Sequence, residues 1–302
     1  MLSPGHLRSL FSALHAVVDF GALEEVTLEA NPATFDASKA RLFRELGVTR
    51  VSLGIQSFDA QVLATLGREH TAAQAVSAVA ILRQVGMPAV NIDLMFSIPG
   101  QSKECWQATL EQALALRPEH ISAYNLSYEE DTAFFNSLLR GEMRDDEDYN
   151  AEFFHLADVV LGDAGFDHYE TSNFASPGHH SLHNSGYWRG EDYLGLGPSA
   201  VTTTANVRST NVADTTRYIA QIQTLGHALA EAETLDPEAR RLERIALGLR
   251  TSEGIALDLL TSEALSRADH LAAAGLLRIA EDRLVLIHHG RALVDPIASE
   301  LV

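Results

Sequence analysis

The chain has 302 residues, of which 46% are apolar and 21% charged, and this predicts about two globular domains at roughly 150 residues each. A net charge of −19 would repel a phosphate backbone, which argues against a nucleic-acid partner. No apolar run approaches the roughly 18 residues that span a bilayer, and no basic leader precedes a hydrophobic stretch, so we expect a cytoplasmic protein outside the membrane.

The first half alternates predicted helices with predicted strands. Helices are expected at Pro4–Val18, Asp36–Glu45, Thr71–Val85 and Lys103–Leu116. Strands are expected near Glu25–Glu29, Arg50–Gly54, Ala89–Phe96 and His120–Leu126. N-cap residues are Ser3, Asp36 and Ser102, and glycines suited to a left-handed helix end are Gly47, Gly86 and Gly165. The strands are nearly continuous apolar runs, as burial on both sides of a parallel sheet requires, so the fold class is α/β.

The pattern changes in the second half. One long helix is predicted for residues 145–165, followed by irregular structure and β-hairpins over residues 166–211. From about residue 225 the sequence predicts helices, a hairpin and a final helix, which together suggest a winged-helix-like module of about 75 residues. Residues 226–302 contain 8 Arg against 13 Asp and Glu, so we expect this module to pack against protein and not to bind DNA.

Polar residues follow the ends of the predicted strands, where parallel barrels carry their function. They are Glu29, Gln56, Asp93 and the pair Tyr124-Asn125, with Arg68 in the predicted helical stretch after Gln56. Each of them alone is explained by a helix cap or a bond to a neighbouring loop. Together they favour a shared site for a polar small molecule, with carboxylates, an amide and a guanidinium suited to hydroxyl, amine and carboxylate groups.

A second concentration of polar and aromatic residues lies in the stretch ETSNFASPGHHSLHNSGYW. His179 and His183 are four residues apart, which would suit zinc on a helix, but Pro177-Gly178 and Gly186 argue against a helix here. Aromatic side chains beside a neutral imidazole also suit haem, with histidine as an axial ligand. The competing explanation is that the aromatic residues only anchor a long loop.

Six motifs together resemble the radical S-adenosylmethionine proteins related to oxygen-independent coproporphyrinogen III oxidase. They are TLEANP, SLGIQSF, LGREH, NIDLMFSIPGQ, YETSNFASPGHHSLHNSGYW and YLGLGP, and they cover nearly all of residues 1–200. Within that superfamily, HNSGYW resembles the HNxxYW signature of the haem chaperone branch, HemW, more than that of the oxidase.

The resemblance implies roles for two groups of residues. The motif positions that contact S-adenosylmethionine in this family are occupied by Glu29, Gln56, Arg68 and Asp93. The motif implicated in haem binding is occupied by His183, Asn184, Tyr187 and Trp188, and His183 is the expected ligand of the haem iron.

The sequence departs from the family pattern in two respects. The family's CxxxCxxC loop and GGGTP segment lie upstream of the helix with which this chain begins, so we expect an N-terminally truncated chain. Its one cysteine, Cys105, matches no cluster ligand, so we expect that the chain alone cannot bind the family's [4Fe–4S] cluster and that turnover is absent. The chain also has GPSAVTT where the family usually has a GPGAHS-like loop.

The resemblance therefore predicts an incomplete (β/α) radical-SAM-type barrel over residues 1–165, an extension carrying HNSGYW over 166–224, and a small helical domain over 225–302. The expected function is that of a HemW-like haem chaperone that binds haem and passes it to a membrane-bound acceptor. Two alternatives remain at this stage: a coproporphyrinogen III oxidase of porphyrin biosynthesis, and an inactive truncated gene product.

Overall fold

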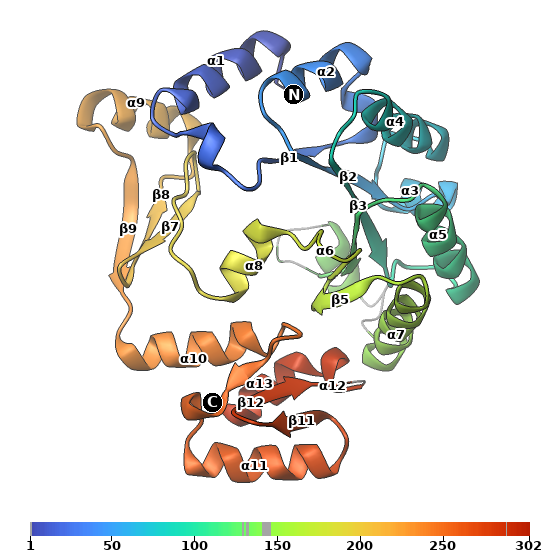
Figure 1. Ribbon diagram of the computed structural model, residues 1–302, viewed down its shortest axis with the longest axis vertical. Helices are drawn as coiled ribbons and strands as arrows, with labels where there is room; N and C mark the ends of the chain where they lie inside the picture. Colours follow the sequence, from blue (N-terminus) through green and yellow to red (C-terminus); the bar gives the residue numbers. More distant parts are fainter. Residues whose placement is uncertain (1, 129, 131–132, 141–145, 288) are drawn as a thin grey trace. The chain divides into compact units, whose positions relative to one another are not determined.

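The computed structural model describes residues 2–128, 130, 133–140, 146–287 and 289–302. The chain forms two compact units, Met1–Leu182 and His183–Val302, and Figure 1 colours the chain by residue number. No helix in the described ranges has the length and apolar character needed to cross a membrane.

A six-stranded sheet with the order β1-β2-β3-β4-β6-β5 forms the centre of the first unit. Its strands are β1 Thr27–Ala30, β2 Arg50–Gln56, β3 Ala89–Phe96, β4 His120–Asn125, β5 Asp167–Glu170 and β6 Asn173–Ala175. The first four strands are parallel, and β6 and β5 continue the sheet in antiparallel pairs. The α/β class and the four parallel strands are confirmed, whereas the three-part domain division stays a prediction.

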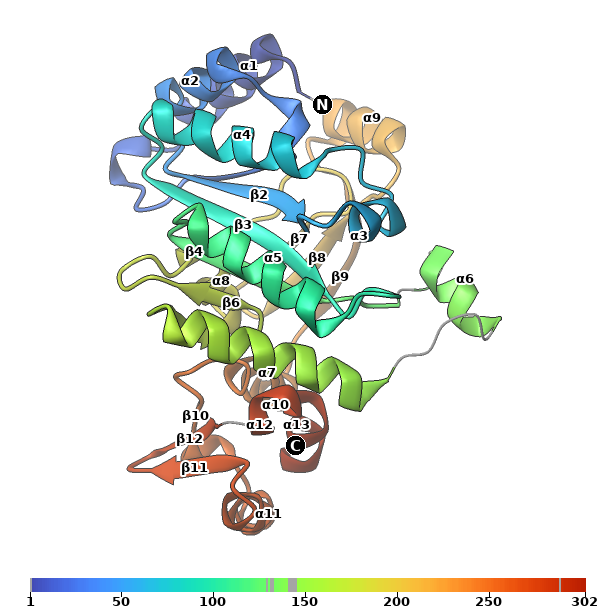
Figure 2. The ribbon, with the colours of Figure 1, turned by 90° about the vertical axis from the view of Figure 1, so that its right-hand side faces the viewer.

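Helices α4, α5 and α7 cover one face of the sheet in Figure 2, and the first unit has seven α-helices among its described residues. They are α1 Pro4–His15, α2 Ala37–Glu45, α3 Ala60–Thr65, α4 Ala72–Gln84, α5 Lys103–Ala115, α6 Ala133–Leu139 and α7 Glu147–Asp163. The predicted caps are confirmed, since the side chains of Ser3, Asp36 and Ser102 each accept a bond from a backbone N–H three residues on.

The core of the first unit lies between the sheet and these helices. Trp106 of α5 is fully buried, and its indole N–H donates to the carbonyl oxygen of Phe153 on α7 at 3.0 Å. Apolar strand residues such as Leu53 and Ile92 face the same core. This side of the sheet is therefore fixed by packing, which leaves the opposite side free to carry polar groups.

The second unit contains two three-stranded sheets, ordered β7-β8-β9 and β10-β12-β11. Its strands are β7 Val201–Thr204, β8 Val207–Asn211, β9 Leu229–Thr234, β10 Ile255–Ala256, β11 Leu277–Ala280 and β12 Arg283–Leu286. Its helices are α9 Thr215–Leu225, α10 Pro237–Gly248, α11 Ser262–Ala273, α12 His289–Ala292 and α13 Val294–Leu301. The helices and hairpin expected after residue 225 are present around their own apolar core.

Two local expectations were wrong. Residues Leu182–Trp188 form a helix, α8, in which Gly186 is accommodated, although the glycine had argued against one. Arg68 lies in the loop between α3 and α4 and not in a helical stretch. Both errors concern segments of seven residues or fewer, where neighbouring structure outweighs intrinsic propensity.

Candidate functional site

Two rows of residues run across the strands on the face opposite the helices. The first row aligns Glu29, Ser52, Asn91 and His120, and the second aligns Gly54, Asp93 and Ser122. Alternate residues of a strand face the same side, so the two rows share one face while the intervening apolar residues face the core. Strands β2 and β3 are largely buried on both sides as expected, although one side is polar, whereas Thr27 and Glu29 of β1 are exposed.

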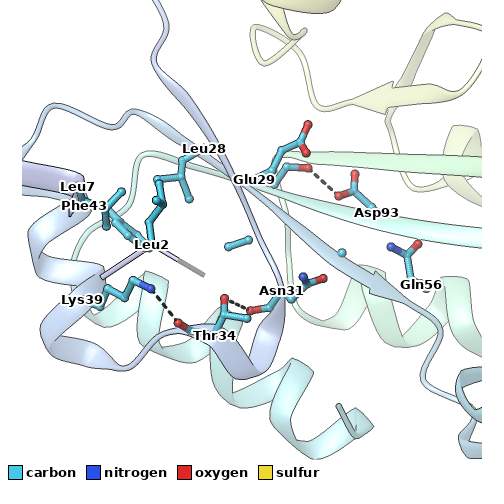
Figure 3. A pocket seen from close by; sticks show the side chains of 13 residues that line it. Leu2, Leu7, Leu28, Glu29, Asn31, Thr34, Lys39, Phe43, Gln56 and Asp93 are labelled. Carbon is cyan, nitrogen blue, oxygen red and sulfur yellow. Dashed lines mark hydrogen bonds between the residues drawn. The ribbon is translucent and has the colours of Figure 1, made fainter. Parts of the chain in front are cut away.

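This polar face forms one wall of a cavity of about 520 Å³. Figure 3 shows Glu29, Gln56 and Asp93 at one end of it. The other end is apolar, with Leu2, Leu7, Leu28 and Phe43. Lys39 lies at the apolar end, where its ammonium donates to the carbonyl oxygen of Thr34 at 3.1 Å. The cavity therefore offers acceptors at one end and apolar surface with a cation at the other.

Asp93 is the most constrained acceptor in the cavity wall. Its carboxylate accepts a hydrogen bond from the Ser52 hydroxyl at 2.8 Å and another from the Asn91 amide nitrogen at 2.7 Å. Burial raises the pKa of the Asp93 carboxyl, the hydrogen bonds from Ser52, Ser122 and Asn91 oppose that shift, and the Glu29 charge adds to it. A hydroxyl or cationic group of a ligand would donate to this carboxylate and offset the cost of its burial. The carboxylate is therefore suited to ribose or amine recognition.

Gln56 reaches the cavity through an unusual backbone conformation. Its φ of 66° lies in the left-handed region, and the pairing of β2 with β3 shifts register between Gly54 and Gln56. The side chain is 8% exposed, and its Oε1 atom has no hydrogen-bond partner among the described residues. A buried amide oxygen without a donor is costly, so this atom is suited to accept a bond from a ligand.

Gly54 provides space beside that amide. A Cβ atom at this position would lie 3.1 Å from both Asn31 Oδ1 and Gln56 Nε2, which is tighter than ordinary contact. A larger residue would therefore displace the polar groups that line the cavity.

The predicted residues do not all come together. Glu29, Gln56 and Asp93 line the same cavity, whereas Arg68 is exposed and is absent from its lining. Tyr124 also lies outside the lining, and burial raises the pKa of its phenol to about 12. Ser52, Asn91 and Lys39 were not predicted as site residues, although the polar residues at alternate positions of β2 and β3 were a usable signal for Ser52 and Asn91.

The HNSGYW motif lies on α8. The rings of His183 and Tyr187 are 4.7 Å apart and nearly perpendicular, and Tyr187 makes a similar contact with Tyr193. Residues four apart face the same side of a helix, which explains the first of these contacts. His183 is exposed and Tyr187 is 40% exposed, while Asn184 and Trp188 are half-buried. The motif thus combines an accessible imidazole with aromatic rings, a set of groups that suits a porphyrin.

The chain's own cysteine content does not suit an iron–sulfur cluster. Cys105 packs on α5 against the small apolar cluster of Val62, Ile98 and Leu126, and burial raises the pKa of its thiol. In the described ranges, no group of three or more His, Cys, Asp or Glu side chains is arranged to hold a metal ion. One protonated thiol does not supply the thiolates that a four-iron cluster requires.

Sequence comparisons identify similar proteins. Residues 5–113 match the radical SAM superfamily. The chain is 36% identical to a Mycobacterium tuberculosis protein named heme chaperone HemW, across 92% of this chain and 72% of that protein. A Bacillus subtilis protein of the same name is 31% identical, across 97% and 80%. For a third, from Lactococcus lactis, the identity is 36%, and the match spans only 58% of that protein.

A structural comparison concerns the fold alone. The chain resembles the coproporphyrinogen III oxidase HemN from Escherichia coli, described as a radical SAM enzyme, with a TM-score of 0.83 and 20% sequence identity. The similarity covers 99% of this chain and 74% of that one. The α/β arrangement of the described residues is therefore that of a radical SAM fold.

Proposed function

Because this chain belongs to the HemW family of radical SAM proteins, we propose that it binds haem and passes it to a membrane-bound acceptor, as a haem chaperone. The observation that carries the proposal is the arrangement on α8, where the accessible imidazole of His183 lies beside the ring of Tyr187. A neutral imidazole donates a lone pair to iron, and aromatic rings pack against the macrocycle. Asn184 and Trp188 complete the haem motif.

We further propose that the cavity beside Asp93 holds the adenosyl end of S-adenosylmethionine. The carboxylates of Glu29 and Asp93 are suited to accept bonds from ribose hydroxyls, and the unpartnered Oε1 of Gln56 is suited to an amine. Arg68 would join this set only if its exposed side chain turned towards the ligand. S-adenosylmethionine supplies a 5′-deoxyadenosyl group to radical chemistry when a cluster cleaves it, and the proposal for this chain includes no such cleavage.

The proposal extends to the architecture of the two parts of the chain. We infer an incomplete radical-SAM-type barrel followed by a winged-helix-like module that contacts protein. The acidic composition of that module is the reason for preferring a protein contact to a nucleic acid.

Haemin titration tests the haem site. The parent chain should shift the Soret band of added haemin, and His183→Ala should weaken binding by about tenfold, or about 1.4 kcal/mol. His179 and His180 precede the motif closely enough to substitute for His183. The triple variant with alanine at all three positions should therefore lose more affinity than the single variant.

His270→Ala is the matched control, because it removes an exposed histidine from α11 outside the motif. Its titration curve should match that of the parent chain. Equal curves for the parent chain and the triple alanine variant would show that the motif is only a structural anchor.

A further inference from the structure

A chain of buried hydrogen bonds leads from Asp93 to the segment that precedes His183. Asn91 donates from Nδ2 to Asp93, and its Oδ1 lies 2.7 Å from Nδ1 of His120. The Nε2 atom of His120 lies 2.8 Å from the hydroxyl of Tyr169, which accepts a bond from the backbone N–H of Ser181 at 3.2 Å. Together these bonds connect β3, β4 and β5 to residue 181.

With the Asp93 carboxyl ionised, one proton arrangement fits this chain of bonds. Burial lowers the pKa of His120 to about 3, so its imidazole is neutral and has one donor and one acceptor nitrogen. Asn91 must direct its NH₂ group towards the Asp93 carboxylate, which leaves its oxygen as an acceptor for Nδ1–H of His120. Nε2 then accepts from the Tyr169 hydroxyl. Every polar atom along the path is satisfied, and such a network favours a single geometry.

Other contacts hold the same segment. The ring of His180 stacks on Tyr169 with centroids 4.3 Å apart and planes within 9°. Arg50 is paired with Glu25 at 3.0 Å and donates to the carbonyl oxygens of His179 and His180 at 3.0 and 3.2 Å. Residues 179–181, which belong to no helix or strand, are thus held at their backbone by buried side chains of the sheet.

We propose that Tyr169 and His120 are positioning residues for haem binding, which fix residues 179–182 and thereby the start of α8, where His183 is the second residue. This inference rests on the proposed haem site at His183. Neither side chain need touch haem. They hold the segment in place before haem binds, and this lowers the conformational entropy that the segment loses on binding.

Tyr169→Phe is the sharpest test, because it keeps the ring that stacks on His180 and removes only the hydroxyl between His120 and Ser181. Haemin titration should show about tenfold weaker binding. Tyr149→Phe is the matched control: it removes a hydroxyl that donates to the Gln101 carbonyl on the helix-covered side, and it should leave haemin affinity unchanged. His120→Gln should weaken haemin binding in the same direction as Tyr169→Phe.

A double-mutant cycle separates positioning from general weakening of the fold. If Tyr169 acts through His183, Tyr169→Phe should cost about tenfold in the parent chain and nothing further in the His183→Ala chain. An equal loss in both backgrounds, or no loss in the parent chain, would overturn the inference. If the variant with alanine at His179, His180 and His183 binds haemin as tightly as the parent chain, the proposed haem site fails, and this inference fails with it.

Discussion

At the scale of single residues, Asp93 is the side chain on which the proposed adenosyl binding depends most. Asp93→Ala removes a ligand acceptor together with the hydrogen bonds that the Ser52 hydroxyl and the Asn91 amide donate to it. Calorimetry with S-adenosylmethionine should therefore show binding weakened by about tenfold or more. Asp269→Ala, which removes an exposed carboxylate from α11, is the control. Undiminished affinity in the Asp93 variant would remove this residue from the site.

His120 makes the stability of the fold depend on pH. The unfolded imidazole binds a proton below its ordinary pKa of 6.5, whereas burial keeps the folded imidazole neutral down to about pH 3. In that window the unfolded state binds more protons, so the free energy of unfolding falls as pH drops from 6.5 towards 3, by up to about 1.4 kcal/mol per pH unit. The raised pKa of Asp93 acts in the opposite direction, because there the folded state holds the proton more tightly.

Urea unfolding between pH 7 and pH 4 measures this dependence. As pH falls, the free energy of unfolding should decrease more steeply for the parent chain than for His120→Gln. The difference in this free energy between the two proteins should therefore narrow as the solution becomes acidic. A gap that is constant over this range would show that His120 is not kept neutral by the fold.

Part of the candidate site could be predicted from the sequence, because Glu29, Gln56 and Asp93 stand at or near the ends of successive strands. The chain of bonds through His120 and Tyr169 could not. His120 and Tyr169 lie 49 residues apart in the sequence, and their pairing depends on β6 and β5 joining the sheet after β4. No local pattern encodes such a contact. Arg68 shows the reverse case, since its place in a motif does not fix where its side chain points.

At the scale of elements, the bounds of long strands and helices were predicted more accurately than those of short helices. Strand β3 has the predicted bounds, and α4 and α5 are each within about a residue of theirs. These elements have capping signals and long apolar patterns. Helices α3 and α8 lack a long apolar pattern, although Asp59 caps α3, and they form where the surrounding chain favours them, which sequence periodicity does not reveal.

The packing of α5 against α7 rests on Trp106. Trp106→Ala would open a cavity in a fully buried site and remove the indole bond to Phe153, so the free energy of unfolding should fall by about 3–5 kcal/mol. Trp106→Phe keeps most of the volume and should cost less than half of that. Urea unfolding followed by far-ultraviolet circular dichroism measures both, and a loss below about 1 kcal/mol for the alanine variant would contradict the assigned role.

At the scale of the whole molecule, an exposed sheet edge and the strong net charge have opposite effects on association between copies of the chain. Within the described part of the sheet, β1 pairs only with β2, and Thr27 at its start is exposed. Unpaired edges favour association between copies, whereas a net charge of −19 repels them. Sedimentation should therefore show association that increases with protein concentration and with salt, because salt screens the repulsion.

Thr27→Lys places a charge on that edge and should reduce the association, while Thr224→Lys on α9 should not. A single monomeric species at every concentration and salt level would contradict the expectation.

The chain has two tryptophans, and the structure places one in each unit. Trp106 is fully buried and Trp188 is half-buried, so their fluorescence should differ in colour and in access to quenchers. Replacing Trp188 with phenylalanine leaves an emission that reports on the first unit alone, and replacing Trp106 leaves one that reports on the second. The protein thus carries intrinsic optical probes with which the unfolding of its two halves can be timed separately, without any added label.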